Sequence, residues 1–188
     1  MWRLFSLKHG NADVAAHSAA ILYRTTVEQA RRPIFYSACG VPDTLDGRFE
    51  LIALHMFLVL HRLKAEGPAA ERLSQELFDT MFGDMDRSLR EMGVADLGVG
   101  RRIRAMAEGL YGRMAAYESG LAADDSVLAA ALRRNLYGTL RDSEPAAAVL
   151  AAVCGYVRAA VRELAAQPLQ RLAAGGVTFP DVPAPQVE

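Results

Sequence analysis

Apolar residues recur every three or four positions along most of this chain, which is the spacing of one face of an α-helix. The clearest example is the stretch from residue 69 to residue 91, whose apolar side chains fall on one arc. They are Leu73, Leu77, Phe78, Met81, Phe82, Met85 and Leu89. No stretch shows the sustained alternation, rich in β-branched residues, that is typical of strands. The pattern predicts an all-α protein, a single-domain helical bundle of about six helices over residues 1–188.

Glycine, proline and capping residues divide this pattern into six predicted helices. Asn11 or Asp13 can cap the first helix, which ends near Arg32 because Pro33 follows. The later helices are predicted at about residues 46–64, 69–91, 96–121, 125–138 and 145–167, each bounded by similar signals. The glycines and prolines beyond residue 174 predict an irregular C-terminal tail over 175–188, in which only Val177–Phe179 is expected to be ordered.

The predicted second helix is apolar around nearly its whole circumference, so it is either buried or offers one face to an apolar partner. Arg48, His55 and Arg62 are the exceptions, and their spacing of seven residues puts them on one stripe. Two interpretations stay open. One is a basic edge beside an apolar groove that binds a client protein. The other is pairing with acidic residues of a packed neighbour, for which the candidates are Glu76, Asp79 and Asp84.

The predicted fourth helix carries a stripe of small residues in addition to its apolar seam. Two glycines inside a helix each cost about 1 kcal/mol relative to alanine. We therefore expect a neighbouring backbone to approach this helix closely along the stripe, which consists of Ala105, Gly109, Gly112 and Ala116.

A polar turn precedes the second helix. Asp43, Thr44 and Asp46 can all cap a helix start, and Gly47 permits a close backbone approach. Capping explains one of the two acids, but not both together with Arg48. The turn is therefore either a rigid entry to the helix or a recognition loop, and both interpretations stay open.

Composition excludes several classes of function. The chain has 188 residues and a formal net charge of −1, so no overall positive field attracts nucleic acid or anionic lipid. Cys39 and Cys154 form neither a metal motif nor a disulfide framework, which fits a reducing compartment. The longest apolar runs are shorter than the ~20 residues that cross a bilayer, and no secretory signal is visible.

No arrangement of residues predicts catalysis. The four histidines lack the spacing of a helical metal site, and there is no glycine-rich phosphate loop. We therefore expect no enzyme activity, metal or cofactor, and no haem-attachment motif is present.

Two basic segments are candidates for surface contacts. Arg101, Arg102 and Arg104, reinforced by Arg113, either form a solvated cluster or contact ribosomal RNA or lipid headgroups. Residues 1–10 are either a frayed terminus or a membrane-interface arm, because apolar and aromatic side chains alternate there with basic ones. The membrane-contact candidates are Trp2, Arg3, Leu4, Phe5 and Lys8.

Several segments resemble the ubiquinol–cytochrome c chaperone family, which assembles the cytochrome bc1 complex. The most specific is Val41-Pro42-Asp43-Thr44 followed by Gly47-Arg48-Phe49-Glu50. The resemblance covers roughly residues 30–140. Its other segments are Pro33-Ile34-Phe35-Tyr36, Leu54-His55, Leu60-His61-Arg62-Leu63, Asp84-Met85-Asp86, Leu89-Arg90-Glu91-Met92-Gly93-Val94, Tyr111-Gly112-Arg113 and Arg134-Asn135-Leu136-Tyr137.

The resemblance implies an assembly chaperone that binds newly made cytochrome b or another bc1 subunit. In mitochondria such proteins act with a small partner near the ribosome exit. This chain shows no Arg- and Ser-rich transit peptide, so we expect a bacterial member that is cytoplasmic and peripheral at the inner membrane. The mitochondrial partner and its ribosome contact do not carry over to this chain from the resemblance, and a ribosome contact stays open.

Together these patterns place a client-binding groove near the second and fourth helices, rimmed by the turn. The predicted partner-binding residues are Pro42, Asp43, Thr44, Asp46, Gly47, Arg48, Glu50, His55, Arg62 and Arg113. The alternative is a non-catalytic adaptor, either a homodimer or a helical protein on a membrane surface, in which the apolar excess forms an oligomer interface.

Overall fold

The computed structural model describes the backbone of residues 3–140 and 144–182, and the side chains in these ranges from Val14 onward. All regular elements in these ranges are helices, which confirms the predicted all-α bundle. In chain order they are α1 (Arg3–Ala30), α2 (Ile34–Ser37), α3 (Leu45–Lys64), the short 3₁₀ helix η1 (Gly67–Ala69), α4 (Glu71–Glu91), α5 (Asp96–Ala122), α6 (Asp125–Leu136), α7 (Ala147–Ala165) and α8 (Leu169–Ala173).

Helix α3 is the centre of the bundle. It contacts α1, α4, α5, α6 and α7, and every residue from Glu50 to Leu60 is buried. A helix that is apolar all round must be covered on every side, because each exposed face would leave apolar area in water. The apolar circumference of α3 is therefore explained by burial within the chain itself.

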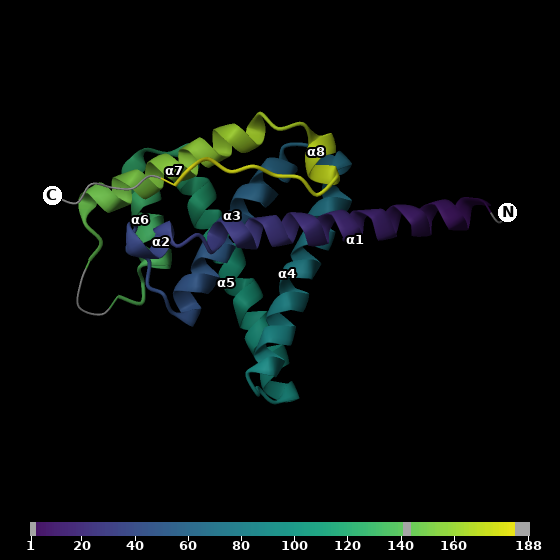
Figure 1. Cartoon of the computed structure of the whole chain (residues 1–188), viewed down its shortest axis with the longest axis horizontal. Helices are drawn as coiled ribbons and strands as arrows, with labels where there is room; N and C mark the ends of the chain where they lie inside the picture. The colour runs from purple at the N-terminus through teal and green to yellow at the C-terminus, as the bar shows by residue number, and fades with distance from the viewer. Residues whose placement is uncertain (1–2, 141–143, 183–188) are drawn as a thin grey trace.

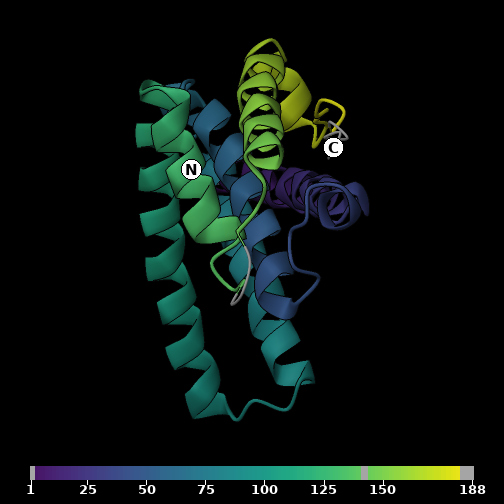
Figure 2. The same cartoon turned by 90° about the vertical axis from the view of Figure 1, so that its left-hand side faces the viewer.

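Helices α4 and α5 form a hairpin that projects away from the rest of the molecule (Figures 1 and 2). The predicted apolar arc of α4 is confirmed: Leu73, Leu77, Met81 and Leu89 are buried, and Phe78, Phe82 and Met85 pack partly buried against the core. Gly93 closes the hairpin turn with a φ of 81°, a conformation that favours glycine. The first half of α1 also projects beyond the bundle (Figure 1).

The helix boundaries differ from the prediction mainly at the two ends of the chain. Helix α1 begins at Arg3, so neither Asn11 nor Asp13 caps it. The predicted sixth helix is divided, because α7 ends at Ala165 and Pro168 then begins the separate α8. Helices as short as α2 and α8 show too few turns to give a periodic signal in the sequence.

The described part of the C-terminal tail is irregular but is packed against the bundle. Val177, Pro180 and Val182 are buried, so order extends beyond the predicted Val177–Phe179. The amide of Gln167 pairs with the backbone of Thr178 in both directions, with N–O distances of 2.8 and 2.9 Å. These bonds hold the tail across α7, as the yellow segment of Figure 1 shows.

The small-residue stripe of α5 does not receive a neighbouring backbone, which corrects the prediction. Gly112 faces open space, and a Cβ at Gly109 would lie 2.6 Å from the Arg113 Nη1 atom of the same helix. The close approach occurs instead at Gly120, where a Cβ would lie 2.7 Å from Leu128 Cα of α6. Helix spacing alone could not show which glycine meets the next helix.

In the described part of the chain, no helix combines the length and the apolar character needed to cross a membrane. Trp2 lies outside the described residues. Arg3, Leu4, Phe5 and Lys8 belong to the first turns of α1, and their side chains also lie outside the described part. Their predicted membrane contact stays a prediction.

Candidate functional site

The turn before α3 is closed by backbone and hydroxyl groups. The Thr44 hydroxyl accepts a hydrogen bond from the Gly47 amide at 3.1 Å, which caps the helix. The Thr44 amide donates to the Pro42 carbonyl at 2.9 Å. A Cβ at Gly47 would lie only 2.0 Å from that carbonyl oxygen, so the turn requires glycine there. The turn is a rigid entry to α3, as one of the two interpretations expected.

Charged and apolar side chains of the same turn point outward. Arg48 Nε donates to Asp43 Oδ1 at 2.6 Å, and both side chains are more than half exposed. This hydrogen bond lowers the pKa of the Asp43 carboxyl below its ordinary value. Asp46 is exposed in the first turn of α3, and Leu45 beside it keeps 66% of its surface exposed.

An open hollow of about 680 Å³ lies between this turn and α2. Its lining combines the Asp43–Arg48 pair with the half-buried ring of Tyr36 and with Arg31. Burial raises the pKa of the Tyr36 hydroxyl, and the nearby Asp43 carboxylate raises it further. The hollow therefore presents two guanidinium groups, a carboxylate and a neutral phenol to a ligand.

Glu50 and Arg113 form a two-pronged ion pair that joins α3 to α5. Arg113 Nε donates to Glu50 Oε2 at 2.6 Å, and Arg113 Nη2 contacts Glu50 Oε1. The guanidinium also lies over the Phe49 ring, 5.5 Å from its centre. The hydrogen bonds that Arg113 donates to Glu50 raise the pKa of Arg113. Gly109 leaves the space that the guanidinium occupies.

His55 lies fully buried in the middle of α3. Its Nδ1 is 2.7 Å from the Leu51 carbonyl, and its Nε2 is 2.8 Å from the Tyr156 hydroxyl of α7. The carbonyl can only accept, so Nδ1 carries the proton and Nε2 accepts from Tyr156. Burial lowers the pKa of His55 to about 4, which keeps the ring neutral at pH 7.

Arg62 is also buried, and it caps the C-terminus of α7. Its Nε and Nη2 donate to the carbonyls of Leu164 and Gln167, each at 2.9 Å, and Nη1 pairs with Glu66 at 2.6 Å. Carbonyls at a helix C-terminus lack partners within the helix and favour a cation. Arg62 therefore joins α3 to α7.

The three residues of the predicted basic stripe thus lie in three different places. Arg48 lies on the surface turn, His55 in the core, and Arg62 against the end of α7. Pairing with acids of α4 was wrong, because those acids have other partners. Glu76 pairs with Arg72, Asp79 accepts from Gln75, and Asp84 accepts from Tyr23 and Arg87. Arg48 is exposed at the start of α3, whereas Arg62 is buried against the end of α7, so the two do not form one exposed edge.

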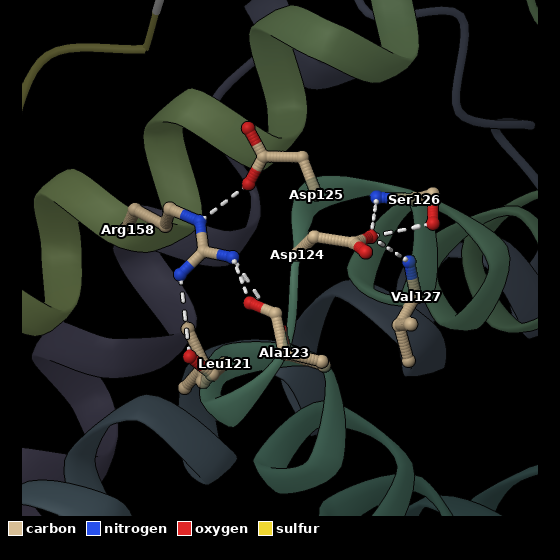
Figure 3. A network of polar contacts seen from close by, with 8 residues as sticks. Leu121, Ala123, Asp124, Asp125, Ser126, Val127 and Arg158 are labelled. Atoms are coloured by element: carbon tan, nitrogen blue, oxygen red, sulfur yellow. Dashed lines mark hydrogen bonds and ion pairs between the residues drawn. The ribbon is translucent and has the colours of Figure 1, made fainter.

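A second hollow, of about 380 Å³, lies at the other end of α3, between α5 and α7. Leu121, Val161 and Arg158 contribute to its lining. Arg158 donates to the carbonyls of Leu121 at 3.3 Å and Ala123 at 3.0 Å, and to Asp125 Oδ1 at 2.6 Å (Figure 3). Arg158 therefore caps α5 and joins α7 to the α5–α6 corner.

Several residues of the turn and of these two hollows carry no signal in the sequence. Tyr36 and Arg31 line the first hollow, but no periodic signal marks either one. Leu45 lies within a polar turn, where the position of its side chain depends on where the helix begins. The sequence does not distinguish Arg158 from other basic residues of an amphipathic helix, because its partners at the α5–α6 corner are far from it in the chain.

Comparison with known proteins identifies the family of the chain. Residues 37–179 match a family described as ubiquinol-cytochrome C chaperone. The Cbp3 homolog from Brucella abortus, known from a crystal structure, has 38% sequence identity and a TM-score of 0.81. The match covers 95% of this chain and 97% of that one.

The chain is also similar to curated proteins of eukaryotes. The ubiquinol-cytochrome-c reductase complex assembly factor 1 of Xenopus laevis is 33% identical over 119 residues, covering 63% of this chain and 60% of that protein. The human factor is 29% identical, and the match covers 64% of this chain and 40% of that protein. The mitochondrial protein CBP3 of Saccharomyces cerevisiae is 30% identical, and the match covers 55% of this chain and 32% of that protein.

The chain therefore spans 60% or less of the length of these three relatives. The family match covers most of the described chain and includes the turn, α3 and the α4–α5 hairpin. It is a family of chaperones and not of enzymes, as the sequence predicted. This chain belongs to the ubiquinol–cytochrome c chaperone family.

Proposed function

We propose that this chain assists assembly of the cytochrome bc1 complex by binding newly made cytochrome b, and that the turn Pro42–Arg48 contacts this client. Relatives of similar sequence are named as assembly factors of ubiquinol–cytochrome c reductase. The observation that carries the proposal is the exposure of Asp43, Leu45 and Arg48 on a turn whose shape is set by other groups.

The closure of the turn does not depend on these three side chains. Thr44, the Pro42 carbonyl and Gly47 close it, so Asp43 and Arg48 are available as a surface pair. Leu45 places an apolar side chain in water beside them, where a partner can cover it. A rigid surface with an acid, a base and an apolar group can recognise a polar end of a client segment with little ordering cost.

The client contact is thereby confined to the entry of α3 and the adjoining hollow. The apolar side chains from Leu51 to Leu60 are already covered by neighbouring helices, so they offer no apolar groove without opening the bundle. Among the predicted site residues, Pro42–Arg48 provides this surface and the Glu50–Arg113 pair joins α3 to α5 beside it. His55 and Arg62 instead join α3 to α7 within the bundle.

Complementation of a strain that lacks its own copy of the gene tests this proposal. The readouts are haem-b absorbance and cytochrome b content of isolated membranes. We expect Asp46→Lys combined with Arg48→Glu to lower both while the purified variant keeps its fold. The matched control reverses the exposed i,i+4 pair of α1, as Arg24→Glu with Glu28→Arg, and should restore wild-type levels.

Exchanging Asp43 and Arg48 tests whether this ion pair contacts the client or only stabilises the turn. Asp43→Arg with Arg48→Asp keeps an ion pair but inverts its direction. If this variant supports normal cytochrome b levels, the pair has only a structural role. Normal levels in the Asp46→Lys, Arg48→Glu variant would contradict the proposed client contact, and normal levels in the deletion strain would contradict the function itself.

The remaining predicted partners belong to this same proposal. We place the encounter with cytochrome b at the cytoplasmic face of the inner membrane, with a ribosome contact close to the site of synthesis. The competing homodimeric adaptor predicts a two-chain mass in sedimentation equilibrium, whereas the chaperone proposal predicts a monomer that forms a complex only with its client.

A further inference from the structure

The tip of the α4–α5 hairpin carries two exposed apolar side chains. Leu97, in the first turn of α5, keeps 95% of its surface exposed, and Met92, just after α4, keeps 51%. They lie on opposite sides of the turn at Gly93, at the end of the hairpin that projects from the bundle (Figures 1 and 2). The most exposed large apolar side chain in the described part of the molecule is therefore at its far tip.

The hairpin tip is held together by its own contacts. Arg90 Nε donates to Asp86 Oδ2 at 2.6 Å, and its Nη1 pairs with Asp96 across the turn. The Val94 amide donates to the Leu89 carbonyl at 3.1 Å. The turn is thus closed by backbone and ion-pair contacts, and Leu97 is exposed on a formed helix.

Three cations follow Leu97 along α5. Arg101, Arg102 and Arg104 are exposed, and none of them makes an ion pair with a side chain described from Val14 onward. Arg101 and Arg104 are four and seven residues from Leu97, so these two arginines share one helix face with Leu97. Their Cα atoms lie about 6 and 10 Å further along the axis.

We propose that this tip docks onto an anionic lipid surface. Leu97 and Met92 would enter the boundary between headgroups and acyl chains, and the arginines one to two turns behind would contact the phosphates. Charge complementarity supports this occupant, because no carboxylate among the described side chains pairs with these arginines. An RNA would use the arginines but would leave both apolar side chains in water, so it explains the tip less well.

Docking of the tip would also determine which side of the bundle faces the membrane. In both views the start of α3 lies on the same side of the bundle as the hairpin (Figures 1 and 2). A lipid-bound hairpin therefore turns the Pro42–Arg48 turn toward the membrane, where a membrane-inserted protein emerges. The lipid contact itself does not rest on the proposed function and is tested without any client.

Vesicle flotation of the full chain tests the proposal. We expect binding to vesicles of phosphatidylcholine with phosphatidylglycerol, weaker binding to phosphatidylcholine alone, and loss of binding at high salt. Leu97→Glu should weaken binding roughly tenfold or more, because a leucine can no longer be buried. A glutamate in the first turn of a helix is otherwise favourable, so the variant should fold.

The matched control is Val127→Glu, because Val127 is likewise exposed in the first turn of a helix. It should bind vesicles like the unmodified chain. A second pair of variants tests the cations: Arg101→Gln with Arg104→Gln should lose the preference for phosphatidylglycerol, while Arg24→Gln should keep it. Equal binding of the Leu97 and Val127 variants, or no binding of the unmodified chain, overturns the proposal.

A local probe provides an independent measurement. Cys39 and Cys154 are buried, so an environment-sensitive fluorophore can be attached selectively to Leu97→Cys or Val127→Cys. We expect the emission at position 97 to shift to shorter wavelength with anionic vesicles and the emission at 127 to stay constant. No shift at 97 overturns the proposal, as does a shift with homopolymeric RNA in place of vesicles.

Discussion

The hydroxyl of Tyr156 on α7 donates to Nε2 of His55 on α3 across a distance of 2.8 Å, and the same hydroxyl accepts from Gln29 Nε2 of α1 at 3.0 Å. Three side chains, Gln29 of α1, His55 of α3 and Tyr156 of α7, therefore link three helices through one hydrogen-bonded network. Phe35 and Phe179 pack edge-on against the imidazole at 5.2 and 5.4 Å, which excludes water from it. The Tyr156 hydroxyl can donate to His55 Nε2 only while the imidazole is neutral.

The stability of the protein should consequently fall between pH 6.5 and pH 4. His55 has a pKa of about 4 when folded and an ordinary value of 6.5 when unfolded. The unfolded chain thus binds more protons in this window, and acid favours unfolding. The loss should reach on the order of 3 kcal/mol at pH 4. Urea unfolding at several pH values measures it, and a His55→Gln variant should lack this part of the pH dependence.

Removing the Tyr156 hydroxyl should destabilise the fold. Tyr156→Phe leaves His55 Nε2 buried without a donor, which should lower the free energy of unfolding by ~1–3 kcal/mol. Tyr111→Phe is the matched control because Tyr111 is 59% exposed, and it should change stability by less than ~0.5 kcal/mol. Equal stability of the two variants in urea would show that the buried bond contributes nothing.

The Glu50–Arg113 pair should contribute more than any surface pair. Arg113 is 24% exposed and Glu50 9%, so Glu50→Gln leaves a largely buried guanidinium without its carboxylate. We expect a loss of ~2–3 kcal/mol in the free energy of unfolding. Arg24→Gln removes an exposed pair at 3.9 Å and should cost less than ~0.5 kcal/mol. A loss no larger than that of Arg24→Gln would contradict this role.

Two glycine substitutions should have opposite effects. Gly47→Ala places a Cβ 2.0 Å from the Pro42 carbonyl, so the turn must shift and both stability and complementation should fall. Gly112→Ala meets open space inside α5 and should stabilise the protein by up to ~1 kcal/mol through helix propensity. Thermal unfolding of the two variants measures the contrast, and a stabilised Gly47→Ala protein would disprove the close contact.

Local interactions made most of the helical architecture predictable. The 3.6-residue period of α4, the cap before α3 and the proline and glycine stops depend on neighbouring residues alone. The VPDT and GRFE segments were likewise specific enough to indicate the family. By contrast, the separate α8 and the packing of the tail beyond Phe179 were not predicted, because contacts with distant parts of the chain stabilise them.

Which side chains are accessible was decided by the tertiary structure. Arg48, His55 and Arg62 have the same spacing and similar chemistry, so their stripe on α3 could not show which of them reaches solvent. The packing of α7 against α3 buries His55 and Arg62, and Arg48 escapes because α3 has only just begun there. Burial depends on what the rest of the chain places beside a residue. Periodicity along one helix carries no information about that.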